Sequence, residues 1–183
     1  MYKLVSMRDS VRVDPSLLGK KPMEAVDVSL RKAYEGLMDR QVGVVLCITK
    51  VESVGEGKII PGDAGVYYDT VFEMLIYRPE LHEVVEGTII EIVDFGAFIR
   101  LGPIDGLVHI SQITDDYISY SKDGVLMGRE SKRVLKSGDK VRARIITVSY
   151  KHSQSAKVGL TMRQPGLGKI DWAGEEEGGV VLA

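Results

Sequence analysis

The hydrophobic pattern of the chain changes near residue 81, and this change limits the possible folds more than any other feature. Between Met23 and Ala33, apolar residues recur at spacings of three and four, which is typical of an amphipathic helix. From Val66 to Tyr77, apolar and polar side chains alternate, which indicates a strand with one packed face. After residue 81 only short β-type segments follow. We therefore expect an α+β unit followed by an all-β unit.

The α+β unit is expected to span residues 1–81. Its pattern predicts a strand at 1–13, a helix from Pro22 to a left-handed stop at Gly36, and a strand at 44–51. Residues 54–65 carry four glycines and one proline and are predicted to form a loop around a short extended piece. The next strand ends at Arg78-Pro79, since proline cannot donate to a strand ladder. Its apolar face consists of Val66, Tyr68, Thr70, Phe72, Met74 and Ile76.

The all-β unit is expected at residues 82–165, followed by a tail at 166–183 whose final part, 175–183, is expected to be disordered. A long polar insertion at 112–138 separates the third β segment from the fourth. Five strands with one long connection are typical of a small Greek-key barrel, the OB fold, whose sheet face and loops bind oligonucleotides. The five segments are 84–93, 96–101, 106–110, 139–149 and 157–162.

The sequence gives little indication of a catalytic site or a metal-binding site. Cys47 is the only cysteine, which excludes an internal disulfide and a cysteine-based zinc site, and its apolar surroundings favour a buried side chain over a nucleophile. The three histidines lack the spacing of metal ligands. No phosphate-binding loop or hydrolase motif occurs. We therefore expect no metal, no cofactor and no active site on this chain.

The segments that could target the chain to a membrane are also missing from the pattern. No run approaches the roughly 20 apolar residues of a membrane span, and the N-terminus has no apolar core of a signal peptide. Together with the single cysteine, this favours a soluble protein in the reducing cytoplasm, without a membrane partner.

The charges are divided unevenly along the chain, although the net charge is only −2. Residues 83–116 carry seven acids and one base, whereas residues 129–163 carry ten Lys or Arg and two acids. A basic segment in an otherwise acidic chain indicates a footprint for a polyanion such as nucleic acid. The alternative interpretation is an ordinary solvated face.

Two phenylalanines and a histidine lie close together in the stretch IVDFGAFIRLGPIDGLVHIS, residues 92–111. In a regular strand Phe95 and Phe98 would point to opposite faces, but a bulge at Gly96 would bring both rings to one face, beside His109. Such a platform stacks unpaired bases. Alternatively, both rings belong to the core. Cations of the basic segment would follow the phosphates; the candidates are Arg142, Arg144 and Lys151.

Most of the second unit resembles the S-one RNA-binding domain, an OB-fold family. Five β segments match in order. They are contained in four stretches, the first of which holds two of them: EGTIIEIVDFGAFIRL, GLVHIS, GDKVRARI and KVGLTMR. The resemblance implies that Phe95, Phe98 and His109 face RNA, together with Lys157, which stands just before the last strand. Family members often carry an aspartate where this chain has Ser153, so the resemblance does not extend to that contact.

The whole chain up to about residue 172 resembles the stalk-subunit family of archaeal RNA polymerase, which is related to the seventh subunit of the eukaryotic enzyme. The matching segments include MYKLVSMRDSVRV, IIPGDAGVYYDTVFEMLIYRPELHEVVEG, GPIDGLVHISQITDDYISY and RQPGLGKIDW. The resemblance implies a truncated ribonucleoprotein-like first domain, a small helical partner subunit, and a barrel near the emerging transcript. It also implies a tip loop that contacts the polymerase core, formed by Pro61, Gly62, Asp63, Ala64 and Gly65.

Some alternatives stay open on the sequence alone. Many family members have glycine where Ala64 stands, and the loop also fits a plain tight turn with positive φ at Gly62 and Gly65. Trp172 is expected to anchor the C-terminus against the barrel or a partner. Tyr117 and Tyr120 face either a partner or RNA. The leading hypothesis is a non-catalytic subunit of this nucleotidyltransferase complex that binds single-stranded RNA; the alternatives are a free-standing RNA-binding factor in translation or decay, and a purely structural scaffold.

Overall fold

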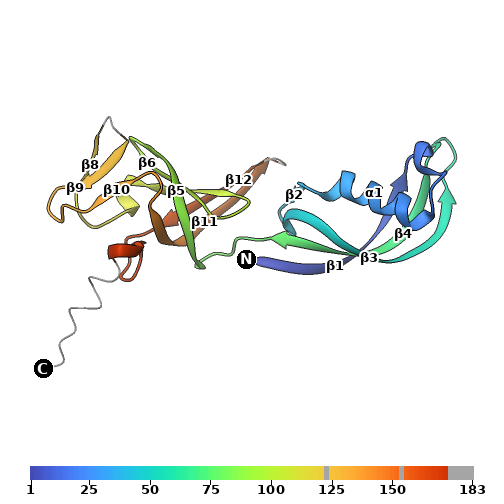
Figure 1. The fold of residues 1–183 in the computed structure, drawn as a ribbon, viewed down its shortest axis with the longest axis horizontal. Coiled ribbons are helices and arrows are strands. Elements are labelled where there is room, and N and C mark those ends of the chain that lie inside the picture. The colour runs from blue at the N-terminus through green and yellow to red at the C-terminus, as the bar shows by residue number, and fades with distance from the viewer. Residues whose placement is uncertain (122–123, 153–154, 173–183) are drawn as a thin grey trace, which may run out of the picture. The chain divides into compact units, whose positions relative to one another are not determined.

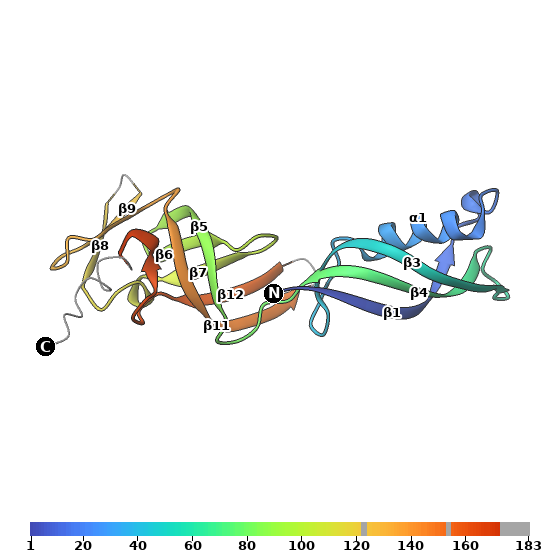
Figure 2. The same ribbon diagram turned by 60° about the horizontal axis from the view of Figure 1, so that its bottom comes forward.

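The computed structural model describes residues 1–121, 124–152 and 155–172, except for the side chains of residues 151, 152, 155 and 156. The chain divides into two compact units, Met1–Arg78 and Pro79–Ala183, which are coloured from blue to light green and from green to red in Figures 1 and 2. No helix in the described part of the chain is long and apolar enough to cross a membrane.

The first unit is an antiparallel sheet with a helix on one face (Figures 1 and 2). Helix α1 begins with a proline at its first position, where the missing N–H has no acceptor to lose. The strand order is β1-β4-β3-β2, and β1 pairs with β4 over its whole length. The elements are β1 (Tyr2–Val13), the 3-10 turn η1 (Pro15–Leu17), α1 (Pro22–Tyr34), β2 (Met38–Asp39), β3 (Gly43–Ile59) and β4 (Val66–Tyr77).

The core of the first unit lies between α1 and the sheet. The predicted alternation in β4 is confirmed over its second half, where every other side chain is buried. Phe72 is completely buried, and its ring packs against that of Tyr34 on α1 at 5.2 Å between centroids. The buried core residues are Val11, Val13, Ala25, Val26, Leu30, Val45, Ile48, Phe72, Met74 and Ile76.

Two boundaries differ from the prediction. Helix α1 ends at Tyr34, and Gly36 then adopts the predicted left-handed conformation with φ of 81°. The predicted loop at 54–65 is wrong for its first half, because β3 continues to Ile59. Gly55 and Gly57 lie tightly against β4: a Cβ on Gly57 would stand 2.8 Å from a methyl of Val66. This close approach requires glycine at both positions. The pairing of β3 with β4 also contains several register shifts, one of them between Val54 and Gly57.

The second unit contains a closed five-stranded barrel, as predicted. The barrel strands follow the order β12-β7-β6-β5-β11, and β11 pairs with β12 to close the ring. Strand β7 runs parallel to β12, and the other barrel pairs are antiparallel. The barrel strands are β5 (Val84–Val93), β6 (Gly96–Arg100), β7 (Asp105–His109), β11 (Lys140–His152) and β12 (Ser155–Thr161).

The insertion between β7 and β11 is folded, which the sequence pattern did not reveal. After the 3-10 turn η2 (Ile110–Gln112) it forms a three-stranded sheet of β8 (Ile118–Ser121), β9 (Val125–Gly128) and β10 (Val134–Lys136). The side chains of Leu126 and Leu135 on this sheet are buried. The carboxylate of Asp116 accepts hydrogen bonds from the backbone N–H of Ser131 and Glu130, and these bonds lower its pKa.

The C-terminal segment packs on the barrel domain from residue 168 to residue 172. Strand β13 (Gly168–Lys169) pairs with β11. Gly168 has φ of 112°, and a Cβ there would stand 3.0 Å from the Trp172 ring. The indole is only 9% exposed, and the guanidinium of Arg133 lies over it at 5.4 Å. Trp172 therefore anchors this segment on its own domain. Residues 173–183, including the end expected to be disordered, lie outside the described residues.

We expect Trp172→Ala to lower the free energy of unfolding of the second unit by about 3 kcal/mol, because the truncation empties a filled core position. On the side of the indole that faces Ile113, Leu126 and Leu135, the cavity that remains has a volume of about 10 Å³. Trp172→Phe keeps most of the volume and should cost less than half as much. Urea denaturation followed by circular dichroism measures both; equal stability of all three proteins would contradict the anchoring role.

Candidate nucleic-acid interface and tip loop

Phe95 stands in the turn between β5 and β6, and its side chain is 47% exposed. Val93 pairs with Gly96, so the turn consists of Asp94 and Phe95 alone. The predicted bulge at Gly96 is wrong: the irregularity lies in β5, between Ile89 and Glu91. Gly96 is required for another reason, since a Cβ there would stand 2.1 Å from the carbonyl oxygen of Val108 on β7. The ring of Phe95 is therefore exposed because the residue lies in the turn, and not because of a bulge at Gly96.

Phe98 points out of the barrel. Its neighbours Ala97 and Ile99 are completely buried in the interior, and side chains alternate between the two faces of a strand. The Phe98 side chain is half-buried. Its ring centroid lies 6.4 Å from that of Phe95, at an angle of 84° between the planes. The two rings are therefore an edge-to-face pair on the outside of the barrel and not part of its core.

His109 completes this cluster at the end of β7. It pairs with Gly96, and the backbone N–H of Ile110 donates to the carbonyl of Phe95, which ties the end of β7 to the turn. The Nδ1 of His109 accepts a hydrogen bond of 3.2 Å from the backbone N–H of Ser111 and lies 2.8 Å from its hydroxyl. Because Nδ1 accepts, a neutral ring carries its proton on Nε2, which is then available as a donor. The side chain is exposed.

Lys157 lies on the same sheet, two strands away from Phe98. Leu107 on β7 is opposite Phe98 and beside Gly159 on β12. Val158 pairs with Gly106, so continuing the parallel register by one residue puts Lys157 beside Asp105, two residues along the strands from the pair of Gly159 and Leu107. Its ammonium is exposed, and no acid among the described residues lies within ion-pair distance of it. The structure thus brings Phe95, Phe98 and His109 together and adds a cation at their flank.

The other predicted cations do not join this cluster. Arg142 pairs with Glu86 of β5, with 2.8 Å between a guanidinium nitrogen and the carboxylate. Arg144 lies next to Thr161 of β12 and Val84 of β5; its Nε is buried and has no hydrogen-bond partner among the described residues. The side chain of Lys151, like Ser153, lies outside the described residues.

Two further cations of the basic segment already have partners within the second unit. Arg163 forms an ion pair with Asp115. The guanidinium of Arg129 lies 4.6 Å from the ring centroid of Tyr117, an otherwise exposed side chain of the insertion. These contacts could not be predicted, because the partners lie in a folded insertion that the sequence showed only as polar. The cationic surface is accordingly smaller than the composition of residues 129–163 indicates.

A metal centre finds no support in the described residues, which contain no group of three or more His, Cys, Asp or Glu side chains able to hold an ion. Cys47 is half-buried and not fully buried as expected. It pairs with Leu75, on the face of the sheet away from α1, which explains its partial exposure.

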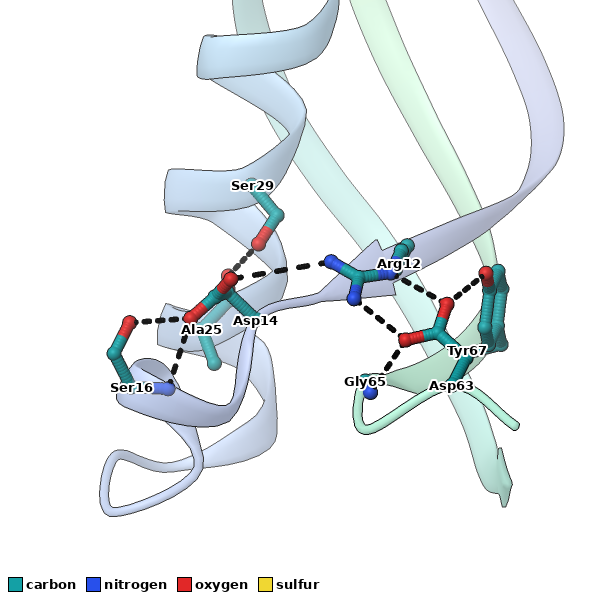
Figure 3. A network of polar contacts seen from close by, with 8 residues as sticks. All are labelled: Arg12, Asp14, Ser16, Ala25, Ser29, Asp63, Gly65 and Tyr67. Atoms are coloured by element: carbon teal, nitrogen blue, oxygen red, sulfur yellow. Dashed lines mark hydrogen bonds and ion pairs between the residues drawn. The ribbon is translucent and has the colours of Figure 1, made fainter. Parts of the chain in front are cut away.

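The predicted tip loop is the connection between β3 and β4, and Asp63 organises it (Figure 3). Its carboxylate accepts two bonds from the guanidinium of Arg12, at 2.8 and 2.5 Å, one from the hydroxyl of Tyr67 at 2.7 Å and one from the backbone N–H of Gly65 at 2.8 Å. The hydrogen bond from Arg12 is the largest cause that lowers the pKa of Asp63 well below its usual range. The same contact raises the pKa of Arg12.

The loop fixed in this way presents apolar side chains to solvent. Ile59 is 75% exposed and Ile60 48% exposed, and Pro61 and Ala64 are also exposed. Gly62 has the expected positive φ, 92°.

The same expectation for Gly65 is wrong. Position 65 requires glycine for another reason: a Cβ there would stand 2.9 Å from the guanidinium carbon of Arg12. The loop thus needs one glycine for its backbone conformation and another for its ion pair.

Comparison with known proteins agrees with this two-part construction. Residues 8–64 match the family described as "SHS2 domain found in N terminus of Rpb7p/Rpc25p/MJ0397", and residues 78–156 match the S1 RNA binding domain. The small ribosomal subunit protein bS1 of Leuconostoc lactis is 35% identical over 94 residues, which are 51% of this chain and 19% of that protein. This similarity extends over about half of the chain.

The relatives that match nearly the whole chain include the following two. DNA-directed RNA polymerase subunit Rpo7 of Sulfolobus acidocaldarius is 42% identical over 177 residues, 96% of this chain and 97% of that protein. Its counterpart in Saccharolobus solfataricus is 44% identical over 174 residues, 94% and 97% of the two chains. The resemblance to an archaeal RNA polymerase subunit is confirmed. The chain belongs to the family of DNA-directed RNA polymerase subunit Rpo7.

Proposed function

We propose that this chain is a non-catalytic stalk subunit that docks on the RNA polymerase core through its tip loop, together with a small helical partner, and binds single-stranded transcript on its barrel. The observation that carries the proposal is the pair of aromatic rings, Phe95 and Phe98, that stand outside the barrel in a chain of the Rpo7 family. Rings left facing water on an S1-type barrel suit stacking with unpaired bases.

The tip loop suits docking because it is ordered before any partner arrives. The Asp63 contacts fix residues on both sides of the loop, so that little conformational entropy remains to be lost on binding. The exposed side chains of Ile59, Ile60 and Pro61 would be buried against the core. A small apolar anchor on a rigid hairpin is a suitable centre for an interface.

The barrel needs only weak affinity for RNA if the chain is held on the polymerase. Tethering raises the local concentration of the transcript, which replaces intrinsic affinity. Weak binding agrees with the neutralised cations, Arg142 and Arg163 among them. A base on an aromatic ring is held through its face, so stacking alone gives little sequence preference.

Affinity purification of the tagged protein from an archaeal host tests docking. We expect the polymerase core subunits and a small helical partner to be recovered with the wild type. Ile60→Asp should lose the core subunits, because a charge would be buried in the interface. Met127→Asp changes a similarly exposed apolar side chain in the insertion and serves as the control. Recovery of ribosomes or nucleases with the wild type would support a free-standing RNA-binding factor instead.

Asp63→Asn should loosen the tip loop and weaken docking without unfolding the chain. The folded-state pKa of Asp63 is depressed, so its contribution to stability is present above the unfolded pKa, near 3.8, and is lost as the pH falls through the lower folded value. The difference in stability between wild type and Asp63→Asn should therefore be constant from pH 7 to about pH 4 and shrink below that.

Urea unfolding at several pH values measures this difference, and hydrogen exchange of the loop amides at neutral pH reports the loosening. Asp69→Asn is a suitable comparison, because Asp69 pairs with Lys58 on the strands behind the loop. Unchanged exchange at Gly65 in Asp63→Asn would show that the loop does not depend on this carboxylate.

Phe95→Ala and Phe98→Ala should each weaken binding of single-stranded oligoribonucleotides by about tenfold, the value of one stacked base. Because Phe95 is exposed, its truncation should change the free energy of unfolding by less than about 1 kcal/mol. Tyr2→Ala, an exposed aromatic of the first unit, is the control. Loss of several kcal/mol of stability in both variants, with unchanged affinity, would favour the structural scaffold.

The same measurement over a range of salt concentrations tests the phosphate contacts. Lys157→Gln should reduce the log–log salt slope by about 0.7, the value for one contact with a single strand. A slope near zero in the wild type would contradict phosphate binding.

A further inference from the structure

On the barrel face that carries Phe98, carboxylates without an ion-pair partner among the described residues lie on one side of the ring, and one such ammonium lies on the other. Arg100 and Asp105, the next residue pair along the strands on this face, neutralise each other in an ion pair of 3.3 Å. Glu91 on β5 is directly opposite Phe98, so the two Cβ atoms are about 5 Å apart. Asp94 lies in the turn beside Phe95, and both carboxylates are exposed. On the far side, beyond β7, stands the exposed ammonium of Lys157 on β12. In the part of the chain that the structure describes, Glu91 has no cationic partner.

The irregularity in β5 places the carboxylate at this position. Ile89 pairs with Ile99 and Glu91 pairs with Phe98, so Ile90 has no partner on β6. With regular pairing, Ile90 would stand opposite Phe98. The hydroxyl of Ser137 donates to the carbonyl of Ile90 at 3.0 Å, which helps to hold the extra residue. A bulge that re-aims one side chain often serves a binding site.

These charges orient a bound RNA strand across the barrel. Phosphates are attracted toward Lys157 on β12 and repelled by Glu91 and Asp94. With the sugar-phosphate backbone above β7 and β12, a base stacked on Phe98 points its free edge toward β5. The carboxylate of Glu91 is the group that this edge meets.

We infer that Glu91 reads the edge of the stacked base and makes the platform prefer guanine, an inference that rests on the proposed binding of RNA. An ionised carboxylate only accepts hydrogen bonds. Guanine is the base whose Watson–Crick edge offers two adjacent donors, N1–H and the N2 amino group, which match the two oxygens. Adenine and cytosine place an acceptor nitrogen beside their amino group, and the single N–H of uracil lies between two carbonyls. Unpaired bases are read at this edge.

The test compares short oligoribonucleotides of repeated UUG, UUA, UUI and UUU by fluorescence anisotropy at low salt, where I is inosine. Adenine controls for the stronger stacking of a purine, and inosine keeps N1–H but lacks the amino group. We expect the wild type to bind UUG about tenfold more tightly than UUA, the discrimination typical of one bidentate contact, with UUI in between. Glu91→Gln should reduce the UUG/UUA ratio to about threefold or less, since an amide offers one acceptor.

Glu52→Gln removes one negative charge from an exposed position in the first unit and serves as the control; it should leave every ratio unchanged. Equal tightening of all four sequences in Glu91→Gln would overturn the inference, because Glu91 would then only repel phosphates. So would a wild type that binds UUA as tightly as UUG, although RNA binding itself would stand. If no sequence binds, the proposed RNA-binding function fails and the inference fails with it.

Discussion

The close approach of β6 and β7 at Gly96 is the constraint on which the candidate RNA-binding face depends. Only a hydrogen atom fits between this α-carbon and the carbonyl oxygen of Val108, so the two strands meet in one register. That register puts Ala97 and Ile99 into the barrel and leaves Phe98 outside. It also brings His109 to the turn that carries Phe95. Since a shift of one residue would exchange the two faces, the candidate binding face and the barrel core are determined together.

The two candidate sites use charge in different ways. At the tip loop, the carboxylate of Asp63 is fully occupied by Arg12, Tyr67 and a backbone N–H, and its role is to hold a shape. On the barrel, Glu91 and Lys157 have no partners among the described residues and can act on a ligand. The occupied carboxylate supports an exposed apolar loop, whereas the unoccupied groups are the ones that, in our proposal, meet different parts of an RNA strand. Counting charges along the sequence does not separate these two roles.

The sequence predicted the parts of the fold that depend on local periodicity. The alternation around Phe72, the helix that begins at Pro22 and the five barrel strands are all found in the structure. It did not predict the sheet of the insertion, because strands of three or four residues are too short to show a period. Contacts between distant residues were also missed: Arg12 and Asp63 are 51 positions apart, and Arg142 and Glu86 are 56 apart. The aromatic cluster was anticipated, but its geometry comes from a turn and from a bulge in the neighbouring strand.

The burial of Trp172 has a consequence for the order in which the chain can fold. Its indole closes a space lined by Ile113, Leu126 and Leu135, which are synthesised long before it. While the chain grows on the ribosome, the insertion sheet has an open side until residue 172 has left the exit tunnel. The first unit has no such dependence, since its last strand ends at Tyr77. Folding during synthesis can therefore finish in the first unit while the second unit still lacks Trp172.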